Sequence, residues 1–124
     1  MADPSPHHIL LAQRDPNAAQ ALCEALAASG HTVAGPFCAL GDCEGALDRL
    51  EGEGSAFDLA LLDLELEGGL TFALARRLSR HGTRLAFTTA RSDLVAEAGW
   101  PDAPCVTPAP GMEDIVPLLG SREP

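Results

Sequence analysis

Hydrophobic and polar positions along the chain fall into blocks with two different periods. Short blocks that are apolar almost throughout are typical of strands buried on both faces of a sheet. Five such blocks predict strands: His8 to Ala12, Thr32 to Pro36, Phe57 to Leu62, Arg84 to Thr88, and Cys105 to Val106.

The segments between these blocks carry apolar residues at helical spacing. Asp15 and Pro16 supply an N-cap and a first helical residue, and Gly30 ends that helix. Four more helices are predicted: one around Ala46 to Leu50, one from Phe72 to His81, a short one from Asp93 to Ala98, and a last one from Met112 to Leu119. Strands that alternate with helices predict an α/β fold, a doubly wound five-stranded parallel sheet with helices on both faces.

The chain of 124 residues has the length of one domain. We assign residues 8–119 to this domain. Residues 1–7 contain two prolines and no apolar stretch behind a basic start, so they are not expected to be a signal peptide. We expect them to be a short disordered lead. Residues 120–124 are expected to be a polar tail.

In a doubly wound sheet, the functional crevice lies beyond the carboxyl ends of the strands. The residues that follow strands there are Gln13, Arg14, Asp15, Asp63, Thr88, Thr89, Thr107 and Pro108. Asp63 ends the most apolar strand, where a carboxylate is costly to desolvate unless it faces an open crevice. A loop aspartate that caps the next segment is the alternative interpretation of Asp63.

Several segments resemble, in the same order, the landmarks of response-regulator receiver domains of two-component systems. They are His8 to Pro16, Gly30 to Pro36, Phe57 to Leu66, and Leu85 to Arg91, and the resemblance extends from His8 to about Leu119. It implies a flavodoxin-like receiver fold. The turn at Gly68 and Gly69 is similar to that of receivers often found as free-standing domains.

The resemblance also implies roles for individual residues. Asp63 would accept a phosphoryl group from a histidine of a partner kinase. Thr89 would be the hydroxyl that holds this group, with Thr88 as the alternative. Such receivers use a magnesium ion, held by an acidic pair after the first strand, and a lysine after the fifth.

This sequence departs from that pattern at the acidic pair and at the lysine, although Asp63 is retained. Gln13 and Arg14 occupy the two acidic positions, and Asp15 is needed as a helix cap, so Asp63 and Asp15 are weak candidates as metal ligands. The Lys-Pro pair aligns with Thr107 and Pro108, or one residue later, and the chain contains no lysine. We therefore expect magnesium to bind weakly or not at all.

Arg14 offers one replacement for the missing positive charge. Its guanidinium could form a bidentate pair with Asp63, which would then be ionised and poorly reactive toward phosphodonors. The alternative is that Arg14 extends into solvent. The aromatic switch residue usual on the fifth strand of receivers is also missing, and the chain has no tyrosine.

Composition limits the classes of partner. Eighteen acidic residues against eight basic ones give a formal net charge of -10. This charge disfavours nucleic acid and anionic membranes as partners, and no apolar run has the length of a membrane span, so we expect a cytoplasmic protein. The four cysteines, Cys23, Cys38, Cys43 and Cys105, lack zinc-site spacing and are expected to be buried free thiols.

Two functions follow from the sequence. The first is an atypical receiver domain that acts mainly as a protein-interaction module, with impaired phosphorylation and at most slow self-phosphorylation and self-dephosphorylation at Asp63. The second is a working switch, phosphorylated on Asp63 by a histidine kinase or a histidine phosphotransfer protein. A second copy of the chain is a further candidate partner. Trp100 is either an interface aromatic or a residue packed over the short helix.

Overall fold

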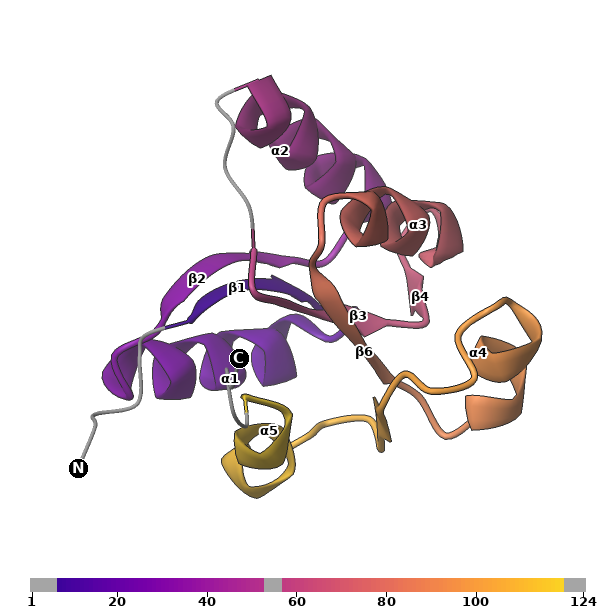
Figure 1. Ribbon diagram of the computed structural model, residues 1–124. Coiled ribbons are helices and arrows are strands. Elements are labelled where there is room, and N and C mark those ends of the chain that lie inside the picture. Colours follow the sequence, from indigo (N-terminus) through magenta and orange to yellow (C-terminus); the bar gives the residue numbers. More distant parts are fainter. Residues whose placement is uncertain (1–6, 53–56, 120–124) are drawn as a thin grey trace.

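The computed structural model describes residues 7–52 and 57–119. Its centre is a sheet of five strands in the order β2-β1-β3-β6-β7 (Figure 1), and each strand is parallel to its neighbours. These strands are β1 (His8–Ala12), β2 (Thr32–Phe37), β3 (Leu59–Asp63), β6 (Arg84–Thr88) and β7 (Cys105–Val106). The predicted doubly wound parallel sheet is therefore confirmed.

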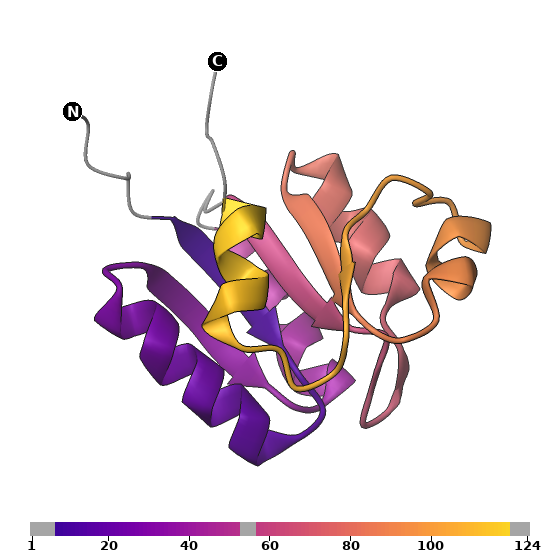
Figure 2. The ribbon, with the colours of Figure 1, turned by 90° about the horizontal axis from the view of Figure 1, so that it is seen from below.

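Helices cover both faces of this sheet. They are α1 (Pro16–Ala28), α2 (Leu40–Gly52), α3 (Phe72–Arg80), α4 (Ser92–Glu97) and α5 (Met112–Leu119). In Figures 1 and 2, α1 and α5 lie on one face, and α2 and α3 lie on the other. The five helices in the described part of the chain match the five that the apolar spacing predicts.

The apolar strands fill a core on each face. Ile9 and Leu11 of β1 belong to the cluster beneath α1 and α5, whereas Leu10 and Ala12 belong to the cluster beneath α2, α3 and α4. This split follows from the alternation of side chains along a strand. Burying one leucine of such a core stabilises the fold by roughly 1.5–3 kcal/mol, which explains why the middle positions of the central strands are apolar.

A small hairpin between β3 and α3 was not expected from the sequence. It consists of β4 (Glu65–Leu66) and β5 (Gly69–Leu70), paired antiparallel. Gly68 and Gly69 have φ of 110° and 145°, values that glycine adopts without strain. The hairpin is tied to the start of α2, because Leu40 N donates a hydrogen bond of 2.8 Å to Glu67 O. The predicted Gly-Gly turn is thus the tip of a strand pair beside the end of β3.

The first helix begins at the predicted cap. Oδ1 of Asp15 accepts hydrogen bonds from Asn17 N at 3.0 Å and Ala18 N at 3.5 Å, and Pro16 is the first helical residue. Such a cap is worth about 1 kcal/mol. The carboxylate of Asp15 is therefore committed to the backbone of α1.

The predicted lead and tail fall mostly outside the described residues. His7, the last residue of the predicted lead, is buried, and its N–H donates to Nδ1 of His31 at 3.0 Å. Its carbonyl accepts from Thr32 N at 2.9 Å. His7 is therefore ordered, although the sequence placed it in the predicted disordered lead.

Trp100 packs inward, onto other aromatic rings. It stacks on Phe72 with a centroid distance of 5.9 Å and an interplanar angle of 16°, and it also contacts Phe87 at 5.9 Å. Of the two interpretations of Trp100, packing near the short helix is the one that the structure shows. The contact joins the loop after α4 to the start of α3.

Candidate functional site

Three of the sequence-predicted site residues lie in one row at the carboxyl edge of the sheet. Asp63, the last residue of β3, is in register with Thr88, the last residue of β6. On the other side of β3, Ala12 is in register with Leu62, so Gln13 follows β1 opposite Asp63. Side chains in register across a sheet share a face. Asp63 therefore lies between a glutamine and a threonine.

The carboxylate of Asp63 is partly buried and is held by backbone donors. Arg14 N donates to Oδ2 of Asp63 at 3.0 Å. Burial raises the pKa of Asp63 above its ordinary value, and the backbone N–H groups of Arg14, Leu64 and Glu65 oppose this rise. Asp63 is therefore harder to ionise than an exposed aspartate, although the surrounding backbone N–H groups favour its charged form.

Gln13 is buried, with 4% of its surface exposed. Nε2 of Gln13 donates to Thr88 Oγ1 at 2.8 Å and to Ala12 O at 3.0 Å. The backbone N–H of Gln13 donates to Phe37 O at 3.0 Å. A carboxamide nitrogen has two hydrogens, so both are used. A neutral side chain thus spans from β1 to β6 at the place where the resemblance implies a carboxylate.

The bidentate pair between Arg14 and Asp63 is not formed, and the prediction of it was wrong for this structure. The Arg14 guanidinium is instead 3.6 Å from Oε1 of Glu65, and its side chain is 62% exposed. Only the backbone N–H of Arg14 contacts Asp63 directly. Glu65 lies on the hairpin that the sequence did not predict, and an exposed guanidinium gains little from leaving water for a buried partner.

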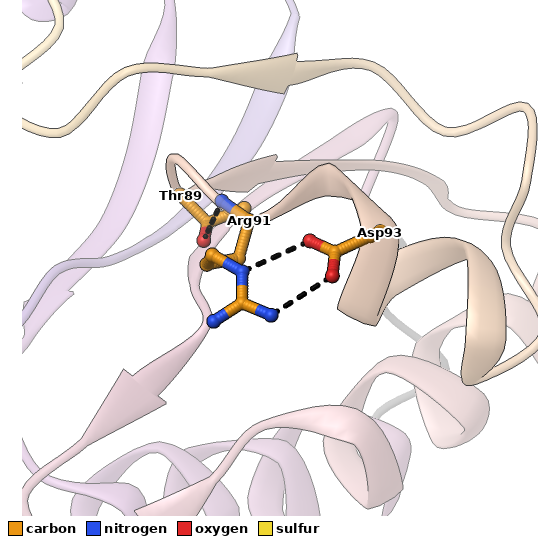
Figure 3. Close-up of polar contacts among 3 residues, drawn as sticks. All are labelled: Thr89, Arg91 and Asp93. Carbon is orange, nitrogen blue, oxygen red and sulfur yellow. Dashed lines mark hydrogen bonds and ion pairs between the residues drawn. The ribbon is translucent and has the colours of Figure 1, made fainter.

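The two threonines after β6 have different environments. Thr88 is buried, and its hydroxyl accepts from Gln13. The hydroxyl of Thr89 accepts a hydrogen bond from Arg91 N at 2.9 Å. The Arg91 guanidinium in turn donates to the Asp93 carboxylate, from Nε at 3.0 Å and from Nη2 at 2.8 Å (Figure 3). Both candidate hydroxyls are thus at the edge that Asp63 occupies, and each already accepts a hydrogen bond.

The loop after β7 completes this edge of the sheet. Thr107 and Pro108 are exposed and directly follow β7. Ala109, the next residue, has φ of 61°, which is uncommon for a residue with a side chain. No lysine exists in the chain to stand at either of these positions.

The residues at this edge do not fit a magnesium site. Asp63 would be one charged oxygen ligand, but the Asp15 carboxylate caps α1 and the Glu65 carboxylate pairs with Arg14. Within residues 7–52 and 57–119, no group of three or more His, Cys, Asp or Glu side chains is placed to hold a metal ion. Magnesium requires several oxygen ligands and keeps its waters tightly.

Thr71 is a site residue that sequence reasoning missed. It is fully buried, and its hydroxyl donates to Asp63 O at 2.8 Å and to Leu64 O at 3.1 Å. It therefore fixes the backbone that carries Asp63. The signal in the sequence is weak: a threonine directly before a helix suggests a cap, yet this hydroxyl bonds to the preceding loop instead.

Two further predictions concern the cysteines and the possibility of a membrane-spanning helix. All four cysteines are free, as predicted. Cys43 is buried, and this burial is the main cause that raises its pKa to about 12. The prediction of burial was wrong for Cys23, Cys38 and Cys105, which are only partly buried. None of the helices in the described residues is long and apolar enough to span a membrane.

Two solved structures share the architecture of this chain. A two-component response regulator from Clostridium difficile aligns with a TM-score of 0.70 and 14% sequence identity, over 91% of this chain and 92% of that one. The chain has the fold of a response-regulator receiver domain. A fusion that includes a trimeric coiled coil of yeast Spc42 aligns with a TM-score of 0.68 and 21% identity, over 95% of this chain and 78% of the fusion. No protein-family model and no curated protein matches the sequence.

Proposed function

We propose that this chain is an atypical receiver domain in two-component signal transduction, acting mainly as a protein-interaction module with impaired phosphorylation at Asp63. The observation that carries this proposal is the Gln13 side chain, which is held by Ala12 and Thr88 where a metal-binding carboxylate would be needed. The receiver fold supports the signalling context.

The chemistry of phosphoryl transfer explains why this arrangement impairs the reaction. Transfer to a carboxylate brings an anion to an anion, and catalysis depends on positive charge at the transferred group. Here the Arg14 guanidinium pairs with Glu65 and the Arg91 guanidinium pairs with Asp93. Asp63 itself has a raised pKa. The pocket therefore supports no more than slow self-phosphorylation and self-dephosphorylation.

The partners that fit this proposal are a histidine kinase, a histidine phosphotransfer protein, or a second copy of the chain. The hairpin β4–β5 presents Leu70, 55% exposed, beside the edge that carries Asp63. An exposed leucine next to the pocket supplies apolar contact area for a protein partner. Such a partner could dock whether or not Asp63 carries a phosphoryl group.

Reconstituting the pocket tests this proposal directly. The natural chain is incubated with acetyl phosphate and magnesium and then analysed by intact mass. In parallel, a triple variant carries Gln13→Asp, Arg14→Asp and Thr107→Lys, which restores the acidic pair and the lysine. Asp63→Asn in each background is the matched control.

We expect no phosphate-sized mass gain in the natural chain and a gain in the triple variant that Asp63→Asn removes. That result would trace the loss of reactivity to the three substituted positions. Labelling of the natural chain itself, lost in its Asp63→Asn control, would instead favour the working switch phosphorylated on Asp63.

A further inference from the structure

A cavity of about 460 Å³ lies at the edge of the sheet opposite to Asp63. Its lining includes Leu59 and Arg84, the first residues of β3 and β6, whereas Asp63 and Thr88 are the last residues of the same strands. Small-molecule sites commonly enclose roughly 300–1,000 Å³. The cavity is therefore large enough for a small ligand and is separate from the aspartate pocket.

The cavity exists because the fifth strand is short. β7 has two residues, which pair only with the last two residues of β6. Before β7, Gly99 has φ of 115°, Pro101 lies in a turn, and Pro104 has no N–H for a ladder. In the described part of the chain, no strand therefore lies beside the first half of β6 on this side.

Hydrogen-bond donors gather around this gap. Thr83 is only 5% exposed, and its Oγ1 has no hydrogen-bond partner within the described residues. Nη1 of Arg84 donates one hydrogen bond to Leu118 O at 3.0 Å, and a guanidinium has five N–H groups in all. A buried hydroxyl without a partner is rare. Because Oγ1 of Thr83 is closed off from solvent, it would reach a ligand that accepts hydrogen bonds only after the Thr83 side chain rotates toward the cavity.

The backbone of β6 adds a further donor on the same side. Arg84 N donates toward β3, to Asp58 O, whereas Phe87 N donates toward the β7 side, to Pro104 O. Successive N–H groups of a strand alternate in direction, so Leu85 N–H faces the same side as Phe87 N–H. That side is where the cavity lies, and Leu85 is part of its lining.

Apolar groups complete the lining. Trp100 borders the cavity, and its ring is fixed by stacking on Phe72 at 5.9 Å. A rigid aromatic ring is a good platform for a flat ligand. Asp102 is the one acidic residue among the lining residues, and its charge opposes an anionic ligand, a dianion about twice as strongly as a monoanion.

We propose that this cavity binds a small planar monocarboxylate, with Arg84 contacting the carboxylate, Thr83 supplying a second donor, and Trp100 packing against the apolar body. The proposal is independent of the phosphorylation state of Asp63. It gives the domain a second site, at the amino ends of the strands.

Trp100 is the only tryptophan of the chain, so its fluorescence reports on the cavity directly. The full-length chain is titrated with benzoate, and with benzamide as the uncharged analogue of the same shape. Amide NMR spectra of the same samples show which residues respond. We expect saturable quenching by benzoate and at least about tenfold weaker binding of benzamide. The amide shifts should be confined to Leu59, Leu118 and residues 79–85 and 99–104, which include the lining of the cavity.

Matched variants assign the contacts. Arg84→Gln is expected to weaken benzoate binding by at least about tenfold, whereas Arg76→Gln, an exposed arginine of α3 outside the lining, leaves it unchanged. Thr83→Val weakens binding several-fold without lowering the free energy of unfolding, because the hydroxyl has no partner to lose within the described residues. This variant keeps the test valid if Arg84→Gln disturbs folding.

Three results would overturn the proposal: no saturable response to benzoate, equal binding of benzoate and benzamide, or amide shifts that centre on Asp63 instead of this cavity. Unchanged benzoate affinity in both the Arg84→Gln and Thr83→Val variants would overturn it as well.

Discussion

Nε2 of Gln13 donates a hydrogen bond of 2.8 Å to Oγ1 of Thr88, across the strand that ends in Asp63. Gln13 directly follows β1, Thr88 is the last residue of β6, and both side chains are buried. A neutral amide therefore links two strands at a position where the resemblance to receiver domains implies a carboxylate.

This bond predicts a measurable contribution to stability. Gln13→Leu removes the donor and leaves the buried Thr88 hydroxyl without it, which should lower the free energy of unfolding by about 1–3 kcal/mol in urea titrations. Gln20→Leu is the matched control, because Gln20 is exposed on α1 and bonds only to Glu24 in the described residues, at 3.0 Å. The effect of the control should stay within about 0.5 kcal/mol.

A double-mutant cycle with Thr88→Val isolates the bond itself. If the bond exists in solution, the double variant is less destabilised than the sum of the two single variants. Strict additivity of the two single effects would contradict the contact.

The raised pKa of Asp63 predicts how stability depends on pH. Because the folded-state pKa exceeds the unfolded value, the ionised carboxylate costs stability above the folded pKa, and this cost disappears as the pH falls through the folded and then the unfolded pKa. Asp63→Asn should therefore raise the Tm at neutral pH, and the difference from the natural chain should shrink in acid. Thermal scans from pH 7 down to pH 3 measure both. A variant that is less stable at neutral pH would show that the amide cradle outweighs burial.

The left-handed backbone at Ala109 predicts a stabilising substitution. Ala109 has φ of 61°, where a Cβ costs about 1 kcal/mol and glycine does not. Ala109→Gly should raise the free energy of unfolding by up to about 1 kcal/mol. Ala90→Gly, at an exposed loop position without positive φ, is the control and should be neutral or destabilising. Equal effects of the two changes in urea titrations would argue against the left-handed conformation.

Burial predicts that Cys43 reacts last among the four thiols. Its pKa is raised to about 12, whereas Cys23, Cys38 and Cys105 are only partly buried. With a maleimide at pH 8, Cys43 should stay unmodified in the folded chain and react fully in guanidinium, because the thiolate is the reacting species. Peptide mapping by mass spectrometry assigns each site. Early modification of Cys43 would mean that α2 opens on the time scale of labelling.

Much of the fold could be predicted from local pattern because each signal rests on nearby residues. The apolar blocks mark all five strands of the sheet, and Asp15 caps α1 through atoms two and three residues away. The β4–β5 hairpin escaped prediction because its strands are two residues long and it is held by contacts to the start of α2. A strand that short has no detectable period.

For the candidate site as well, some features could be predicted from the sequence and others depended on the tertiary structure. The sequence by itself determined which residues reach the carboxyl edge of the sheet, and that neither an acidic pair after β1 nor any lysine is present, because chain order and composition decide both. Only the tertiary structure decided the bonds among them: Gln13 to Thr88, Arg14 to Glu65, and Thr71 beneath Asp63. These pairs are separated by 75, 51 and 8 residues, and their choice depends on burial and on competing partners that only the packed sheet brings together.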